Sequence, residues 1–394
     1  MHFTPLQELE FRIQRLQQAM NAKRLEMVLV MENTDLFYFT GTAQAGWLFV
    51  PAEGSPLLLV RRDVARAEQE CPLRPLLPVG GYREIPVLLK TNRLPIPETM
   101  GMELDVLPVK EFWRYQQIFP QTRIDDASGI IRQVRMIKTA YEIERIRQSA
   151  VLHDRMFSHV ESVLREGMTE VELAAEAEAF SRRQGHQGYA SFRGFNMQLF
   201  YGHLMSGPHA AVSSCSESPT GGLGIAPSFP QSASLQPIRR DTPVLVDYVG
   251  RYNSYMVDET RIYVLGRLPE KLNRAHRVAL DIQAEIIREA RPGVNGAYLY
   301  QRSVDIVNRA GLSEYYMGYG SHVSFVGHGL GLELNELPVL ARGFDVEMEP
   351  GMVLALEPKF VFPGEGVVGI ENTFLMTSLG LEKLTKCPEE VIAL

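Results

Sequence analysis

Four carboxylates and one imidazole could do chemistry together in this sequence, because each lies in a strand-like or glycine-rich stretch and not in a polar loop. They are Asp247, Asp258, His328, Glu357 and Glu371. Unpaired buried carboxylates shift their pKa or destabilise the fold, so gathering four of them on apolar strands requires a cation. We therefore predict a centre of two divalent metal ions. Because imidazole joins the carboxylates, Mn, Co, Fe or Zn suits the centre better than Mg or Ca.

The two aspartates lie on the arms of a predicted antiparallel hairpin within Thr242–Val264. Asp258 comes eleven residues after Asp247, and an apolar run precedes each of them. A turn centred near Tyr252 and Asn253 would place the carboxylates opposite each other, with Cβ atoms about 5 Å apart. A solvent-facing hairpin with two ordinary aspartates is the alternative, and the apolar flanks argue against it.

The other three residues lie in later strand-like runs. Glu357 and Glu371 each end an apolar run, and the segment from Pro363 to Gly366 connects the two runs. His328 is flanked by glycines, which let the backbone pass close to a ligand. A single histidine there would be structural, but as the fifth member of this set it is a predicted ligand.

Two domains are expected to position these residues, because 394 residues exceed the size at which one hydrophobic core stops growing. We predict a small α/β domain over residues 1–130 and a second domain over residues 131–394. The first domain begins with an amphipathic helix over about residues 6–21. Its predicted strands are short β-type runs between Gly, Pro and Asn: residues 27–31, 36–39, 47–50, 57–60 and 102–106.

In the second domain, two capping boxes predict helix starts at Thr139 with Glu142 and at Thr169 with Glu172. The predicted hairpin follows these helices. The same order then appears again, with helices over about residues 269–291 and 295–310 and strands from Ser324 to Leu375. The pattern predicts an internal duplication with a site between its halves.

Short motifs around the five residues carry a family resemblance. They are Asp-x-Thr-Arg at Asp258, Gly-His-Gly-x-Gly-Leu-Glu at His328, Glu-Pro at Glu357 and Ile-Glu-x-Thr at Glu371. Their order resembles that of the pita-bread metallopeptidases, which include Xaa-Pro aminopeptidase, prolidase and creatinase. The resemblance implies an α/β two-domain fold: a creatinase-like N-terminal domain and a pita-bread catalytic domain with α+β architecture and a pseudo-twofold axis.

The resemblance also implies an activity. The chain would be a metal-dependent hydrolase, either an Xaa-Pro aminopeptidase or a dipeptidase. A hydroxide bridging two metals would cleave the amide bond of a small peptide or another small amide. The five residues would be the ligands, Asp258 and Glu371 would bridge the metals, and Glu357 would also be the general base. A homodimer is implied as well.

Several neighbouring residues depart from the family pattern. Asn335 replaces the histidine of a His-Glu-x-Pro segment, and Ser214 replaces another histidine, for which His203 or His209 could substitute. Asparagine can donate a hydrogen bond to a developing oxyanion, so Asn335 is a predicted substrate-binding residue, although it cannot carry a proton.

Two further departures lie beside the last ligand. Gly369 stands where arginine is frequent in the family, and Asn372 stands where aspartate is usual. All these departures leave two other functions open: a non-peptidase C–N hydrolase or lyase, and a non-catalytic binding module. The binding module fits less well, because such modules lose ligands and this chain retains all five.

Composition excludes several function classes. A net charge of −7 gives no basic surface for nucleic acid. Three widely spaced cysteines do not form a disulfide framework, and no apolar run reaches the roughly 18 residues of a membrane-spanning helix. We predict a cytoplasmic protein that binds neither nucleic acid nor membrane.

Overall fold

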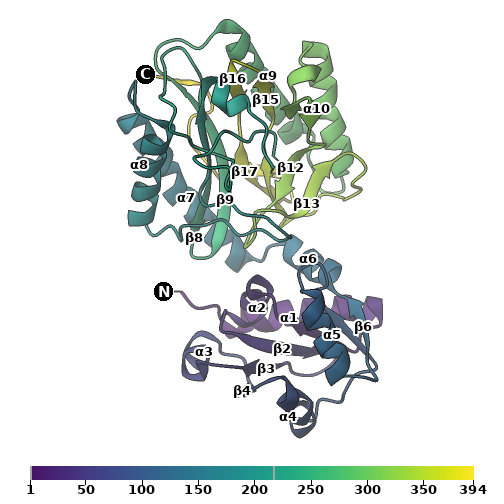
Figure 1. Cartoon of the computed structure of the whole chain (residues 1–394). Coiled ribbons are helices and arrows are strands. Elements are labelled where there is room, and N and C mark those ends of the chain that lie inside the picture. Colours follow the sequence, from purple (N-terminus) through teal and green to yellow (C-terminus); the bar gives the residue numbers. More distant parts are fainter. Residues whose placement is uncertain (1, 216–217) are drawn as a thin grey trace. The chain divides into compact units, whose positions relative to one another are not determined.

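The computed structural model describes residues 2–215 and 218–394, and the chain forms two compact units (Figure 1). One unit consists of Met1–Arg135 with Gly194–Asn196, and the other of Met136–Arg193 with Met197–Leu394. The sequence places the domain boundary at residue 130, five residues before the main segment of the first unit ends.

The first unit is built on a six-stranded mixed sheet with the order β4-β3-β2-β1-β5-β6. Apolar side chains of the strands, such as Leu29, Phe49 and Leu57, are fully buried. The strands are β1 (Met27–Val30), β2 (Gly46–Pro51), β3 (Leu57–Val60), β4 (Leu76–Pro78), β5 (Thr99–Met102) and β6 (Arg123–Asp126). The helices are α1 (Leu6–Lys23), α2 (Asn33–Thr40), α3 (Val64–Glu70), α4 (Ile85–Thr91), α5 (Val109–Ile118) and α6 (Ser128–Met136).

Two of the predicted strands in this unit are wrong. Residues 36–39 belong to helix α2, because the Glu32 carboxylate accepts hydrogen bonds from the backbone N–H groups of Thr34 and Asp35 and caps that helix. The run predicted at 102–106 is strand only at its first residue, since β5 ends at Met102. Short apolar runs do not distinguish a strand from a buried helix turn.

The second unit carries the order helix, helix, strands twice. Its helices are α7 (Ala140–Val163), α8 (Glu170–Arg183), α9 (Glu270–Glu289) and α10 (Gly296–Ala310). One sheet has the order β19-β9-β8-β7, and a second has the order β13-β12-β14-β17-β18. The strands are β7 (Gly202–Ser206), β8 (Val244–Tyr252), β9 (Tyr255–Val264), β10 (Gly318–Tyr319), β11 (Ser321–His322), β12 (Phe325–Gly329), β13 (Glu336–Ala341), β14 (Val353–Leu356), β15 (Lys359–Phe362), β16 (Gly366–Gly369), β17 (Asn372–Thr377), β18 (Gly380–Lys383) and β19 (Ile392–Ala393).

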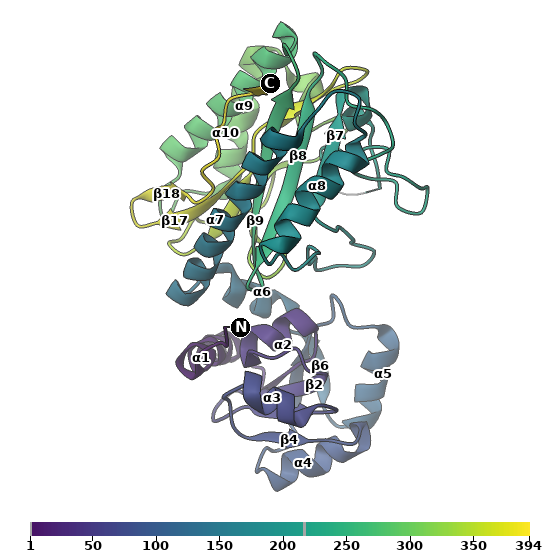
Figure 2. The ribbon, with the colours of Figure 1, turned by 90° about the vertical axis from the view of Figure 1, so that its left-hand side faces the viewer.

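The helices of this unit begin where the sequence predicts them. Thr139 and Thr169 each accept a hydrogen bond from the backbone N–H of the glutamate three residues later, and both capping boxes are complete. Helix α7 packs along β8 and β9, and α8 lies beside α7 and contacts β7 (Figure 2). Helices α9 and α10 pack on β16 and β13. Each helix pair therefore supports one set of strands, and the strands carry the predicted ligands.

Two of the predicted exclusions concern membranes and disulfides. Within residues 2–215 and 218–394, every helix is too short or too polar to span a membrane. Cys71, Cys215 and Cys387 are all free thiols.

Helix α7 also gives the unit an acid-sensitive contact. His153 is buried, its Nε2 lies 2.7 Å from the Tyr248 carbonyl oxygen, and Gly250 packs against its ring. Burial lowers the pKa of His153 from 6.5 to about 3, so the folded state keeps this imidazole neutral. The folded-state pKa lies below the unfolded-state value, so the stabilising effect is complete above pH 6.5 and declines as the pH falls towards 3.

We expect the free energy of unfolding to fall by about 2 kcal/mol between pH 6.5 and pH 5 through His153 alone. His153→Gln, which keeps a donor but does not titrate, should reduce that slope in urea unfolding experiments. The exposed His2→Gln variant is the control and should retain it. An equal slope in wild type and His153→Gln would contradict this assignment.

Candidate metal centre

The hairpin that carries both aspartates is present, but its predicted register is wrong. Asp247 pairs with Thr260, and Asp258 pairs with Val249. The turn is formed by Asn253 and Ser254, whose φ angles are 49° and 75°. Two positive φ values favour a tight two-residue turn, and this turn lies one residue later than predicted. The register therefore shifts by two residues, which keeps the two carboxylates on the same face as diagonal neighbours.

The other three predicted ligands come from the second sheet and its connections. His328 lies in β12, between β13 and β14. Glu357 lies between the ends of β14 and β15, and Glu371 lies between β16 and β17. The backbone of Glu371 also forms an isolated bridge with Thr260 of β9, so both sheets contribute to one cluster.

Three of the predicted carboxylate ligands lie near His328. Around His328 Nε2, the nearest carboxylate oxygens are Glu357 Oε1 at 3.4 Å, Glu371 Oε1 at 3.9 Å and Asp258 Oδ2 at 4.0 Å. Glu371 Oε1 is buried and has no hydrogen-bond partner. Atoms bound to one ion at about 2.1 Å lie about 3–4 Å apart. One ligand atom each of Asp258, His328 and Glu371 lies within 4.8 Å of the other two, so these three residues could hold one metal ion, and Glu357 Oε1 lies beside His328.

Lys359 occupies the other side of the cluster and was missed in the sequence. Its Nζ lies 2.8 Å from Glu357 Oε2, 2.8 Å from Glu371 Oε2 and 3.0 Å from Asp247 Oδ2. Burial alone would lower the pKa of Lys359, but these three carboxylates raise it well above its usual value. The sequence contained one signal for Lys359. Side chains alternate along a strand with a period of two, which places Lys359 on the same face as Glu357.

One lysine does not balance this cluster. Burial and the neighbouring carboxylates raise the pKa of both Asp258 and Glu371 well above the usual range, although Lys359 opposes the shift. Asp247 differs, because the attraction of Lys359 and His203 outweighs its burial and lowers its pKa. The carboxylates facing His328 therefore lack positive charge, and a divalent cation would supply it.

The two candidate substitute histidines lie in different places. His203 is buried in β7, opposite Asp247 in the strand register. Burial lowers the pKa of His203 against the attraction of Asp247. His209 Nδ1 lies 3.6 Å from a carboxylate oxygen of Glu170, and the hydroxyl of Ser214 donates to the carbonyl of Pro230. Among these residues, His203 is the one whose charge environment includes the predicted ligands.

Asn335 is held by main-chain contacts. Its Oδ1 accepts a hydrogen bond of 2.9 Å from the Arg193 N–H, and its Nδ2 donates one of 2.8 Å to the Arg193 carbonyl. The amide therefore fixes the loop containing Arg193 against the β12–β13 connection. An amide NH₂ has two hydrogens and the contact with the Arg193 carbonyl uses one, so the other could form the predicted hydrogen bond to a substrate.

Buried polar groups orient Glu371. The Thr260 hydroxyl donates to Glu371 Oε2 over 2.8 Å. The fully buried Arg261 donates to the Glu371 carbonyl over 2.8 Å and to Asn372 Oδ1 over 2.8 Å. Asn372, which replaces the usual aspartate, thus accepts from an arginine that lies beneath the cluster.

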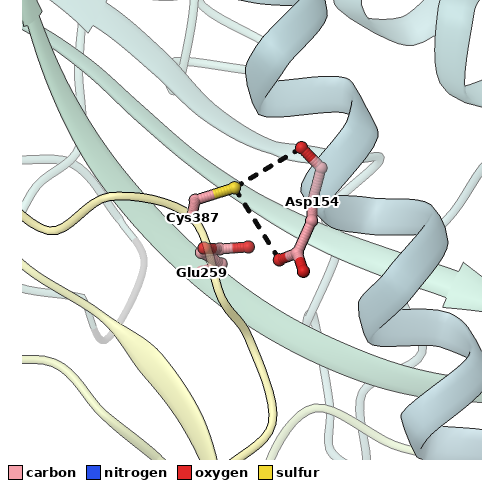
Figure 3. Close-up of side chains that lie close together, drawn as sticks. All are labelled: Asp154, Glu259 and Cys387. Carbon is pink, nitrogen blue, oxygen red and sulfur yellow. Dashed lines mark hydrogen bonds between the residues drawn. The ribbon is translucent and has the colours of Figure 1, made fainter.

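A second group of potential ligands consists of Asp154, Glu259 and Cys387 (Figure 3). The Cys387 thiol donates to Asp154, 3.4 Å from the carbonyl oxygen and 3.7 Å from Oδ1. Burial raises the pKa of Glu259 to about 8, and an Arg261 nitrogen lies 2.7 Å from Glu259 Oε1. The Arg261 guanidinium already supplies the positive charge that a metal ion would bring to Glu259. We therefore interpret this group as a structural contact that joins α7 to β9.

Comparison with known proteins matches a family model to each unit. Residues 144–378 match the family model of metallopeptidase family M24, and residues 12–137 match the creatinase/prolidase N-terminal domain. The chain is 28% identical to an Xaa-Pro dipeptidase of Pyrococcus furiosus over 97% of this chain and 99% of that protein.

Solved structures show the same relationship. An Xaa-Pro dipeptidase from Bacillus anthracis has a TM-score of 0.84 and 26% identity, over 98% of this chain and 100% of that one. The prolidase from Pyrococcus horikoshii has a TM-score of 0.82 and 25% identity, over 97% and 100%. The predicted fold class, with a creatinase-like domain followed by a pita-bread domain, is confirmed.

Proposed function

Because this chain belongs to metallopeptidase family M24, we propose that it hydrolyses the amide bond before proline in short peptides, as an Xaa-Pro dipeptidase or aminopeptidase. The names of the relatives support this substrate class. The observation that carries the proposal is that ligand atoms of Asp258, His328 and Glu371 lie within 4.8 Å of one another, with Glu357 Oε1 3.4 Å from His328 Nε2. Such a set suits Mn, Co, Fe or Zn.

The proposed ligands of the divalent ion are these four residues. When bound, the ion would polarise the scissile carbonyl and make water more acidic. The sequence also predicts a second metal ion. The ammonium of Lys359 lies among the oxygens of Asp247, Glu357 and Glu371, so it competes with a second ion for these oxygens.

Glu357 is the proposed general base. Lys359 holds its Oε2, while Oε1 faces His328, so the carboxylate has a fixed orientation. The carboxylate accepts a proton from the attacking water and delivers it to the leaving nitrogen as the C–N bond breaks. The proposed substrate is a small peptide. Its hydrolysis releases an amino acid or imino acid and a shorter fragment.

Three further expectations belong to this proposal. A homodimer is implied by the family resemblance, and a cytoplasmic location is predicted from the cysteine pattern. Asn335 is proposed to act at the substrate side of the centre, either by donating to the substrate or by fixing the Arg193 loop.

We expect the purified full chain to cleave Xaa-Pro dipeptides or tripeptides after loading with Mn or Co, and to cleave matched Xaa-Ala peptides more slowly. Because the ion supplies several kcal/mol of transition-state stabilisation, removing it with a chelator should lower the rate at least about 100-fold. Amino-acid release, measured by chromatography, checks both expectations. Metal-loaded enzyme without any turnover of Xaa-Pro peptides would contradict the proposal.

A non-peptide C–N hydrolase or lyase is the second candidate. It is favoured by one observation, that both polar ends of the Asn335 amide are already bound by the Arg193 backbone. Metal retention without peptide cleavage, together with turnover of small non-peptide amides, would favour this function. Asn335→His separates the two: a gain in Xaa-Pro cleavage indicates a peptidase with a modified substrate site.

A further inference from the structure

We propose that the ammonium group of Lys359 permanently takes the place of one of two metal ions, so that the centre binds a single metal at the His328 position. This inference rests on the proposed function, because it concerns the same site. It replaces the expected pair of ions by one ion and one side-chain cation.

The oxygens of the two glutamates divide between two positions. Glu357 and Glu371 each direct Oε1 towards His328 Nε2 and Oε2 towards Lys359 Nζ. Asp258 faces the His328 position, and Asp247 faces Lys359. The cluster therefore has the two cation positions expected of a dinuclear site, and the ammonium lies in one of them.

The contacts of Lys359 leave it no other role. An ammonium has three N–H donors, and three carboxylate oxygens lie within 3.0 Å of Nζ. The residue is 1% exposed. All its donors are therefore used inside the cluster, and no N–H remains to bind a substrate.

The backbone makes room for this side chain. Lys359 pairs with Gly369 across the β15–β16 hairpin. A Cβ atom on Gly369 would lie 2.5 Å from the Pro358 carbonyl oxygen, 2.7 Å from Lys359 Cα and 2.9 Å from Lys359 Cγ, so glycine lets both the backbone and the side chain of Lys359 lie close to this strand. Gly369, where the family often has arginine, is thus the residue that accommodates Lys359. Lys359 and Gly369 therefore pack against each other across the hairpin.

The charge balance of the cluster also favours one bound metal ion. Four carboxylates line the cluster, and Lys359 compensates for one of them. One divalent ion at the His328 position compensates for most of the remainder. A second divalent ion would have to share the oxygens of Asp247, Glu357 and Glu371 with an ammonium less than about 4 Å away, where repulsion in a buried site is large.

Metal stoichiometry of the full chain tests the inference. The apoprotein is titrated with Mn(II), bound metal is counted by elemental analysis, and electron paramagnetic resonance distinguishes an isolated ion from a coupled pair. We expect one isolated Mn(II) per wild-type chain. Lys359→Gly, which removes both charge and bulk, should bind two coupled ions. Lys359→Met, which removes the charge but keeps the bulk, should remain at one.

The matched control is Lys271→Ala, which removes an exposed lysine that pairs with Glu365, and it should behave as wild type. Two coupled ions in wild type would overturn the inference, as would a folded wild type that binds none, or a folded Lys359→Gly that stays at one. If Lys359→Gly does not fold, the wild-type stoichiometry still decides. Absent Xaa-Pro cleavage with one bound ion would contradict only the proposed function, whereas cleavage with two coupled ions would contradict only the inference.

Discussion

Glu357→Gln is expected to lower kcat/KM for Xaa-Pro peptides by at least about 10³-fold, because general-base catalysis alone contributes about 10²–10⁴-fold. The carboxylate lies between His328 Nε2 at 3.4 Å and Lys359 Nζ at 2.8 Å. An amide has a single oxygen, so its NH₂ group would face either the ammonium or the metal position. The substitution therefore removes a base and weakens a ligand at the same time.

Metal analysis of Glu357→Gln separates these two roles. Retained metal with a low kcat identifies the carboxylate chiefly as the base, and lost metal identifies it chiefly as a ligand. The control is Glu365→Gln in the turn of the same hairpin, where the side chain is 41% exposed and pairs with Lys271. That variant should keep wild-type kinetics. Unchanged kcat/KM in Glu357→Gln would exclude both roles.

Arg261→Met is expected to destabilise the second unit by about 3–5 kcal/mol, because it removes several buried hydrogen bonds from a charged donor, each of which contributes about 1.5–3 kcal/mol. Arg261 is fully buried. Its guanidinium lies 2.7 Å from Glu259 and donates to Asn372 and the carbonyl of Cys387. Methionine fills much of the volume but removes the charge beside Glu259 and one donor each from Asn372 Oδ1 and the Cys387 carbonyl. Urea unfolding followed by circular dichroism measures the loss.

The exposed pair of Arg277 and Glu270 provides the control, because its two atoms are also close, at 2.6 Å, but lie in solvent. Arg277→Met should cost at most about 1 kcal/mol. The double variant Arg261→Met with Glu259→Met should be more stable than Arg261→Met alone, since it also replaces the buried Glu259 carboxyl by an apolar side chain. A small effect of Arg261→Met would show that Arg261 does not stabilise the structure beneath the cluster.

The local sequence was sufficient for much of the fold. Capping boxes at Thr139 and Thr169 fixed two helix starts, because a cap depends on residues only three positions apart. The predicted strand at residues 36–39 was wrong because its local pattern is ambiguous. Its apolar residues fit both a strand and a helix, and the hydrogen bonds from the Glu32 carboxylate decided for the helix.

The site was predictable in kind but not in register. The apolar run before each aspartate indicated a buried hairpin, and the period of two kept Asp247 and Asp258 on one face. Their exact pairing depended on two positive φ angles at Asn253 and Ser254. Such angles follow from the turn that the strands impose, and two polar residues in sequence do not specify them.

By itself, the sequence determined which residue types gather at this centre, because four carboxylates on apolar strands demand a cation wherever the strands meet. Only the tertiary structure shows that Lys359 is one such cation. Lys359 and Gly369 are ten residues apart, and no local motif links them. The β15–β16 pairing places the lysine over the glycine, among carboxylates from three separate segments. A contact between residues distant in sequence has no local pattern, so the side chain that fills one cation position becomes visible only after the chain has folded.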